Sequence, residues 1–197
     1  LAIKLRNLGY KINHLDLGGG FGVDYTMKNL LNYKSFSKAL NEVFKNNEFQ
    51  LSVEPGRSLI AESGILLTKV IRTKSTNYKN FLIVDAAMNN LIRPTLYNAT
   101  HSIQPLKIKS DRSSKKYDIV GPICETGDFL GIDFNLQETK KNEVLAIMTC
   151  GAYGSVMRSN YNSRPSAAEV FILNNKEILL RKREKIDQLL NLDIIPN

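Results

Sequence analysis

The spacing of apolar and polar positions predicts a strand, a helix and a second strand in the first part of the chain. The strands are the short apolar runs "KINHLDLGG" and "FQLSVEPGR", which end in glycine and in Pro-Gly. The helix between them is expected to begin near Ser35, with an apolar face formed by Phe36, Ala39, Leu40, Val43 and Phe44. Strand, helix, strand is typical of α/β folds, which place their sites at the carboxyl ends of the strands.

Beyond Ser63 the pattern changes to short apolar or alternating runs separated by turn residues. These runs are "GILLTKVIRTKS", "NFLIVDAA", "YDIVGPIC", "EVLAIMTCG", "AAEVFIL" and "KEILLRKR". They predict an all-β domain over residues 64–197, with a terminal helix around "EKIDQLLNL". The charged stretch "KIKSDRSSKKYD" is expected to be a solvated loop.

Residues 1–63 are too few to form a complete α/β domain. Two parallel strands do not make a stable sheet or barrel by themselves. We therefore expect residues 1–63 to be the last strand-helix units of a larger α/β domain that continues upstream of residue 1. On this interpretation the chain is a fragment of a longer protein.

The composition narrows the functional classes. The chain has 197 residues and a formal net charge of +8, but its basic residues are spread along the sequence, so nucleic-acid binding is not expected. No run approaches the roughly 18 apolar residues of a membrane span. The two cysteines, Cys124 and Cys150, are too few for a disulfide framework and lack metal-site spacing. We expect a cytoplasmic protein without membrane contact.

The run "LDLGGGFGVDY" raises the question of what approaches its backbone so closely. Gly18, Gly20 and Gly22 follow each other at every second position, but the dinucleotide fingerprint requires its third glycine where Val23 stands. A tight turn without a ligand and a cradle of bare amides for a phosphate remain as the main alternatives. The "EPGR" that ends the next strand offers similar donors, although alone it could be a surface turn with an ion pair.

Three further motifs mix polar residues with glycine: "DAAMNNLIRPTLY", "VGPICETGDFLG" and "GAYGSVMRSNYNSRP". With them, the chain resembles the C-terminal part of the diaminopimelate decarboxylases. These belong to the alanine-racemase-like class of pyridoxal phosphate (PLP) enzymes, with the ornithine and arginine decarboxylases. The resemblance covers nearly the whole chain. It implies the C-terminal end of a PLP-binding (β/α)8 barrel, followed by a Greek-key-like β domain, with the N-terminal portion of the barrel absent.

The resemblance implies a set of cofactor-binding residues. Bare amides suit the PLP phosphate, and Glu54 would face the pyridine nitrogen, where a carboxylate favours the protonated ring. Tyr153 would reach both the phosphate and the substrate. The phosphate is expected at Gly19, Gly20, Pro55, Gly56 and Arg57.

The substrate residues implied by the resemblance are Arg57, Arg93, Tyr97, Glu125 and Tyr153. Diaminopimelate has two amino-acid ends, so a selective enzyme must hold the distal carboxylate and ammonium while it reacts at the other end. Arg93 can take the carboxylate in a bidentate manner, and Glu125 can take the ammonium. Enzymes of the ornithine type have no need of Arg93, because their substrate lacks that carboxylate.

The resemblance also gives the two cysteines different roles. Cys124 stands where the family places the thiol that protonates the carbanion after CO₂ is lost, whereas Cys150 lies in an apolar run and is expected to be a small core residue. In this family Cys124 and Glu125 come from the neighbouring subunit. A homodimer with shared active sites is therefore expected.

The family's Schiff-base lysine and the histidine that stacks on the PLP ring belong to segments outside this sequence, and neither His14 nor His101 fits the stacking role. The expected function is decarboxylation of meso-2,6-diaminopimelate to L-lysine by the full-length parent, with this chain inactive alone. The alternatives are a relative acting on carboxynorspermidine, ornithine or arginine, or a non-catalytic homologue. A stand-alone β-domain interaction protein would leave the two strand ends unexplained.

Overall fold

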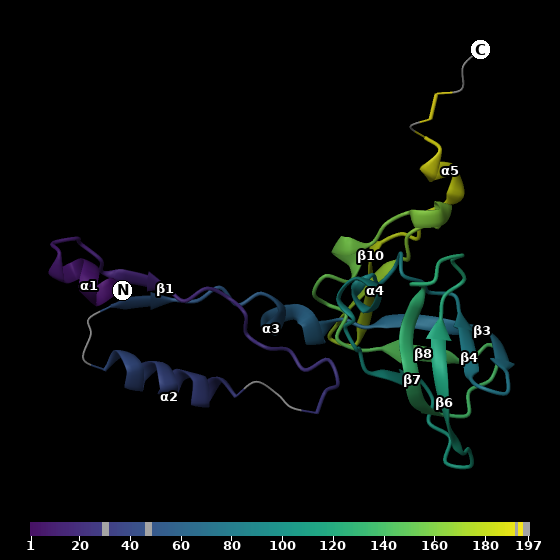
Figure 1. The fold of residues 1–197 in the computed structure, drawn as a ribbon. Helices are drawn as coiled ribbons and strands as arrows, with labels where there is room; N and C mark the ends of the chain where they lie inside the picture. The colour runs from purple at the N-terminus through teal and green to yellow at the C-terminus, as the bar shows by residue number, and fades with distance from the viewer. Residues whose placement is uncertain (29–31, 46–48, 192, 195–197) are drawn as a thin grey trace.

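The computed structural model describes residues 1–28, 32–45, 49–191 and 193–194. They form two parts, an N-terminal arm within residues 1–63 and a β-sheet domain from residue 64 onward (Figure 1). The arm, purple to blue in Figure 1, extends to one side of the sheet domain, and α3 (Arg57–Ile60) lies where the two parts meet. None of the helices in these described ranges is long and apolar enough to cross a membrane.

The arm contains the predicted strand, helix and strand, which are confirmed. After α1 (Ala2–Asn7), the strands β1 (His14–Asp16) and β2 (Gln50–Ser52) pair in parallel on either side of α2 (Tyr33–Phe44) in the sequence. The side chain of Asn32 accepts a hydrogen bond from the Ser35 amide at 3.1 Å, which caps the helix just before the expected start.

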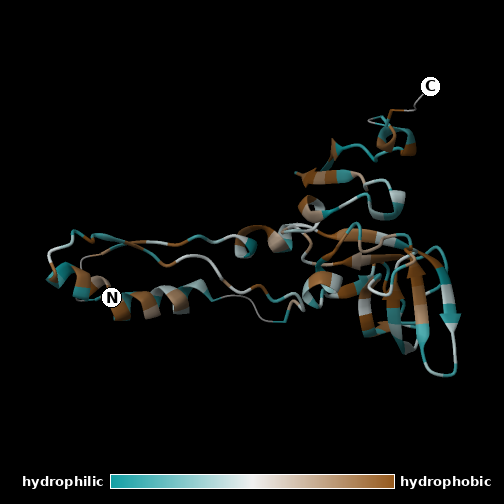
Figure 2. Cartoon of the chain, turned by 45° about the horizontal axis from the view of Figure 1, so that its top comes forward, coloured by the Kyte–Doolittle hydropathy of each residue, from teal (hydrophilic) through white to brown (hydrophobic). Residues whose placement is uncertain are grey.

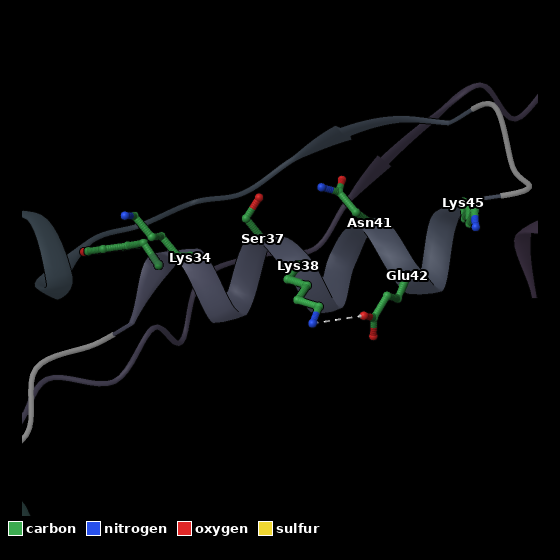
Figure 3. A pocket seen from close by; sticks show the side chains of 7 residues that line it. Lys34, Ser37, Lys38, Asn41, Glu42 and Lys45 are labelled. Atoms are coloured by element: carbon green, nitrogen blue, oxygen red, sulfur yellow. Dashed lines mark ion pairs between the residues drawn. The ribbon is translucent and has the colours of Figure 1, made fainter.

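The helix α2 is amphipathic but has no buried residue, and Val43, expected on its apolar face, is 68% exposed. Figure 3 shows its polar side, where Lys38 and Glu42 pair at 3.9 Å across one turn. The other polar residues there are Lys34, Ser37, Asn41 and Lys45. A single exposed ion pair of this kind contributes little to stability, and this surface offers no catalytic grouping.

The sheet domain follows α3 and a short 3-10 turn at Ala61–Ser63. Its strands are β3 (Leu66–Ser75), β4 (Asn80–Val84), β5 (Ile103–Pro105), β6 (Ser114–Val120), β7 (Phe129–Gln137), β8 (Val144–Ile147), β9 (Glu169–Leu173) and β10 (Lys176–Arg181). The helices are α4 (Arg93–Tyr97) and α5 (Ile186–Leu189), with 3-10 turns at Ser155–Met157 and Tyr161–Ser163.

Six strands form one sheet in the order β5-β8-β3-β4-β6-β7, and β9 and β10 form a separate hairpin. The long strand β3 pairs with β8 through its first half and with β4 through its second. The two edge strands β5 and β7 approach each other, because a Cβ on Gly131 would lie 3.0 Å from Ile103 Cδ1. The sheet is therefore nearly closed around an apolar core, which Figure 2 shows as largely brown strands; its fully buried members include Val70, Leu82, Val84, Leu91, Ile119, Leu145 and Ile147.

The structure corrects the strand prediction at three places. The strands β5 and β7 were not expected, and the charged stretch from Lys107 to Asp118 is not wholly a loop, because its second half from Ser114 belongs to β6. The helix α5 is shorter than expected, and residue 192 of that prediction lies outside the described residues. The domain boundary near Ser63 stays a prediction.

Candidate functional site

The two glycine-containing loops lie side by side at the carboxyl ends of β1 and β2. We call residues 18–22 the glycine loop and residues 54–57 the EPGR loop. The parallel pairing continues past the strands, since the Glu54 amide donates to Gly18 O at 2.9 Å. A Cβ on Gly19 would lie 2.7 Å from Glu54 O, so glycine is what permits this approach. The two loops therefore meet at one end of the strand pair.

Both loops present backbone donors that have no partner among the described residues. Gly18 and Gly20 have left-handed φ values of +70° and +81°, which turn the peptide units out of the strand direction. Within the two loops, the amides that donate no hydrogen bond to any described residue are those of Gly19, Gly20, Phe21, Gly22, Gly56 and Arg57. Neighbouring unpaired amides of this kind form a concave site for an anion. This part of the structure therefore fits the phosphate of PLP.

We predict that Gly19→Ala, introduced into the longer protein of which this chain is expected to be a part, weakens PLP binding roughly tenfold or more. The reason is that overpacking against backbone costs about 1–3 kcal/mol. The added methyl group would push the EPGR loop away from the glycine loop. The matched control is Gly22→Ala, because a Cβ there meets nothing within 4 Å. Cofactor content after dialysis, read from its absorbance, distinguishes the variants; equal retention would show that the close approach is not needed.

A cleft of about 800 Å³ opens beside the EPGR loop. Its lining consists of Tyr25, Arg57, Arg93, Tyr97, Ala99, Tyr153, Val156 and Met157. The structure thus brings together four of the residues proposed from the sequence and adds Tyr25, which was not anticipated. The remaining cofactor residues, among them Glu54 and Pro55, lie in the adjoining loops and are not part of this lining.

Each charged or aromatic side chain of the cleft is positioned by a distinct local feature. Arg93 and Tyr97 are four residues apart on α4 and so share one face. That helix ends at Asn98, whose φ of +54° is left-handed. Arg57 is the first residue of α3. Tyr153 also has a left-handed φ of +58°, and the loop that carries it is tightly packed, because the Gly151 amide donates to Ala61 O at 2.9 Å.

Arg93 is the most unusual group in the cleft. It is only 6% exposed, and no acidic side chain in the described ranges forms an ion pair or hydrogen bond with it. Its guanidinium carbon lies 5.1 Å from the ring centroid of Tyr25 and 5.3 Å from that of Tyr97, within the range of cation–π attraction. Its Nε is buried and has no hydrogen-bond partner among the described residues.

Beneath Arg93 lie two uncharged groups. His101 is fully buried, and desolvation, with the nearby Arg93 charge, lowers its pKa, although its hydrogen bond with Met148 O acts in the opposite direction. Burial raises the pKa of the Cys150 thiol to about 12. Cys150 is thus a neutral core residue, as expected, and neither group compensates the charge of Arg93.

Because His101 is buried, we expect the folded chain to lose stability at mildly acidic pH. Its pKa is lowered in the folded chain from the ordinary value of 6.5, so below that pH the unfolded chain takes up a proton that the folded chain does not. The free energy of unfolding should then fall by up to about 1.4 kcal/mol per pH unit. Urea unfolding at several pH values between about 5.5 and 7.5 measures this slope. His101→Asn should lose most of it; an unchanged slope would assign the effect to other groups.

Cys124 and Glu125 do not line this cleft. They lie on the loop of residues 121–128 between β6 and β7, which we call the thiol loop. Asp128, only 4% exposed, organises it by accepting hydrogen bonds from the Ile123 and Met88 amides, both at 2.7 Å. Cys124 is a free and exposed thiol. Neither Cys124 nor Glu125 is among the described residues that line the cleft of the same chain.

The thiol loop is tied to its surroundings by two hydroxyl groups. Tyr161 donates to Glu125 Oε2 at 3.3 Å, and the negative charge of Glu125 raises the pKa of the Tyr161 phenol. Thr95 of α4 donates to Gly127 O. The same short helix therefore presents Arg93 and Tyr97 to the cleft and Thr95 to the thiol loop.

The functional importance of two residues of this site was not predicted from the sequence. Asp128 stands within the quoted motif "VGPICETGDFLG", and a carboxylate at the start of an apolar strand could have suggested a buried hydrogen-bonding role. Tyr25 ends the quoted glycine motif, but no local pattern connects it with Arg93, which is distant in the sequence.

Residues 20–151 match the family model described as the C-terminal sheet domain of pyridoxal-dependent decarboxylases. The chain is 44% identical to the diaminopimelate decarboxylase of Aquifex aeolicus over 194 residues, which are 97% of this chain and 46% of that protein. It is 44% identical to the Vibrio cholerae enzyme of the same name, covering 99% of this chain and 46% of the relative. The chain therefore spans about half the length of these relatives.

Solved structures give the same result. The diaminopimelate decarboxylase of Helicobacter pylori, complexed with L-lysine, superposes with a TM-score of 0.85 at 38% identity, covering 97% of this chain and 47% of that one. The predicted resemblance and the predicted fold class, an α/β segment followed by an all-β domain, are confirmed. The chain belongs to the pyridoxal-dependent decarboxylase family, whose C-terminal sheet domain it contains.

Proposed function

We propose that this chain is part of a PLP-dependent decarboxylase that converts meso-2,6-diaminopimelate to L-lysine and CO₂. The chain spans only about half of its named relatives, so the proposal concerns a complete enzyme in which a further segment supplies the Schiff-base lysine. Alone, residues 1–197 are expected to be inactive. We refer to the chain together with that segment as the complete enzyme, and we propose the cytoplasm as its location.

The observation that carries this proposal is Arg93, which is buried and forms no ion pair with any described residue. A buried charge without a partner costs several kcal/mol, on the order of 3–5 when one member of a pair is removed. Such an arrangement is retained where a ligand supplies the opposite charge. A carboxylate fits a guanidinium in a bidentate manner. Diaminopimelate carries a second carboxylate at the end that does not react. As substrates for decarboxylation, ornithine and lysine carry only the carboxylate that would be lost.

The cofactor would be held by the glycine loop and the EPGR loop, through the free amides of Gly19, Gly20, Gly56 and Arg57. Glu54, in the same EPGR loop, would accept a hydrogen bond from the protonated pyridine nitrogen. When bound, PLP supplies an electron sink for the pair released as CO₂ leaves. Pro55 fixes the turn between Glu54 and Gly56, and Tyr153 would donate its hydroxyl to the phosphate or to the substrate.

The substrate would lie in the cleft with its distal carboxylate on Arg93. Arg57 and Tyr97, which line the same space, would complete the positive and hydrogen-bonding surroundings of that carboxylate. With the distal end fixed, the other amino-acid end is directed toward the cofactor loops. This arrangement selects the substrate by its length and by its second carboxylate.

The proton donor and the ammonium ligand are proposed to come from a second copy of the chain. In such a homodimer the partner subunit's Cys124 donates a proton to the carbon that lost CO₂, and the partner subunit's Glu125 binds the distal ammonium. The position of the thiol loop supports this: it is ordered by Asp128, exposes Cys124, and lies outside the cleft of its own chain.

The test is release of CO₂ by the complete enzyme supplied with PLP, with meso-diaminopimelate as substrate and ornithine and lysine as controls. Reaction with diaminopimelate alone is the expected result. PLP binding without reaction of any substrate would favour a non-catalytic homologue. Reaction with ornithine at a comparable rate would assign the enzyme to the related decarboxylases instead.

A further inference from the structure

The cleft contains a tyrosine that none of the roles above uses. Tyr25 belongs to the arm, but its carbonyl oxygen accepts a hydrogen bond from the Ser102 amide at 2.7 Å. Its ring lies edge-on against the fully buried His101, with centroids 4.7 Å apart. Two contacts from the sheet domain therefore fix both the backbone and the ring of Tyr25.

The ring of Tyr25 helps to hold Arg93. The guanidinium carbon is 5.1 Å from this ring and 5.3 Å from that of Tyr97, so it is packed against two aromatic side chains. Stacking of this kind restricts a guanidinium to one orientation and leaves its N–H edge for a ligand. Burial lowers the pKa of His101, which lies against the Tyr25 ring, and so favours the uncharged form of this neighbour.

The hydroxyl of Tyr25 is buried and has no hydrogen-bond partner in the described part of the chain, and the same is true of Arg93 Nε. Both residues line the cleft. Leaving two buried polar groups unsatisfied is costly, and each such pair in a native structure calls for an explanation. A guanidinium N–H and a phenol O–H are both donors, so one ligand with two acceptor oxygens satisfies them together.

We propose that Tyr25 is a specificity-determining residue whose hydroxyl, together with Arg93, binds the substrate carboxylate farthest from the reacting carbon. This inference rests on the proposed function, because it requires a substrate with a distal carboxylate. The ring orients the Arg93 guanidinium, and the hydroxyl donates to one oxygen of the carboxylate that Arg93 binds. Amino acids without that carboxylate gain nothing from Tyr25.

The test compares wild type with Tyr25→Phe in the complete enzyme. Phenylalanine keeps the ring against Arg93 and removes only the hydroxyl. We expect the KM for meso-diaminopimelate to rise by about tenfold or more, as for a lost hydrogen bond to a charged group, with kcat within about twofold. The inhibition constant of cadaverine, a diamine with the same five-carbon chain as lysine and no carboxylate, should stay unchanged, whereas that of the product L-lysine, which keeps the distal carboxylate, should rise. Tyr78→Phe removes a hydroxyl from a tyrosine that is 95% exposed and serves as the matched control.

The outcomes separate this inference from the proposed function. An active wild type whose KM is unaltered by Tyr25→Phe overturns the inference alone. So does an equal rise in the KM for diaminopimelate and the inhibition constant of cadaverine, because the effect of the hydroxyl would then not depend on the distal carboxylate. A wild type that neither binds nor decarboxylates diaminopimelate overturns both.

Discussion

Replacing Arg93 with lysine in the complete enzyme should raise the KM for meso-diaminopimelate by well over tenfold. The substitution keeps a positive charge but loses the bidentate contact, and each hydrogen bond to a charged group contributes about 1.5–3 kcal/mol. It also loses the stacking between Tyr25 and Tyr97 that positions the guanidinium. Steady-state kinetics with PLP in excess measures the effect.

The control for this variant is Arg72→Lys. Arg72 lies on the exposed part of β3, away from the cleft, and should tolerate the change. An Arg93→Lys enzyme with an unchanged KM would show that the distal carboxylate binds elsewhere. The substrate would then have to be sought among the relatives that act on simpler amino acids.

Replacing Cys124 with alanine should have the largest effect on turnover. A positioned proton donor contributes typically 10²–10⁴-fold, so kcat should fall by about that factor. PLP should still bind, because Cys124 lies outside the glycine and EPGR loops. Loss of kcat with normal cofactor absorbance supports the role of the thiol, whereas unchanged turnover would remove Cys124 as the acid. Cys150→Ala is the second thiol variant, and it should affect stability more than kcat because that side chain is buried.

The proposed homodimer with shared active sites predicts that two defective subunits can complement each other. In a mixed dimer of Arg93→Lys and Cys124→Ala chains, one cleft combines an intact Arg93 with the partner subunit's Cys124. Random pairing places half of the chains in such dimers, each with one intact site of two, so activity at substrate concentrations well below the wild-type KM should recover to roughly a quarter of wild type. No recovery in co-expressed, tagged dimers would place Cys124 in the cleft of its own chain.

The sequence predicted those parts of the structure that depend on short segments. The parallel pairing of β1 and β2 and the meeting of the glycine and EPGR loops follow from residues near each strand end. Strand β7 was missed because Gly131 and Asp133, whose φ is +54°, interrupt its alternation. β7 is defined by its pairing with β6, and no pattern within its own residues predicts that pairing.

The start of β6 was missed for a related reason. Ser114 to Tyr117 contain two lysines and resemble a solvated loop, but they pair with β7, and Lys115 forms an ion pair with Glu138 at 2.7 Å. Charged side chains at a strand end are compatible with pairing when they extend into solvent. The roles of Tyr25 and Asp128 could not be predicted from the sequence for the same reason, because each residue acts with a partner that is distant in the chain.

The burial of Arg93 has a consequence for the evolution and engineering of this domain. Among the described residues, no acidic side chain pairs with the buried Arg93 guanidinium, and a buried charge in that state lowers the stability of the ligand-free fold. Selection for thermal stability alone would therefore favour an apolar side chain of similar length, such as methionine, at this position. The domain gives up part of its resistance to unfolding at the residue proposed to recognise its substrate, and heat-resistant variants should be checked there first for lost selectivity.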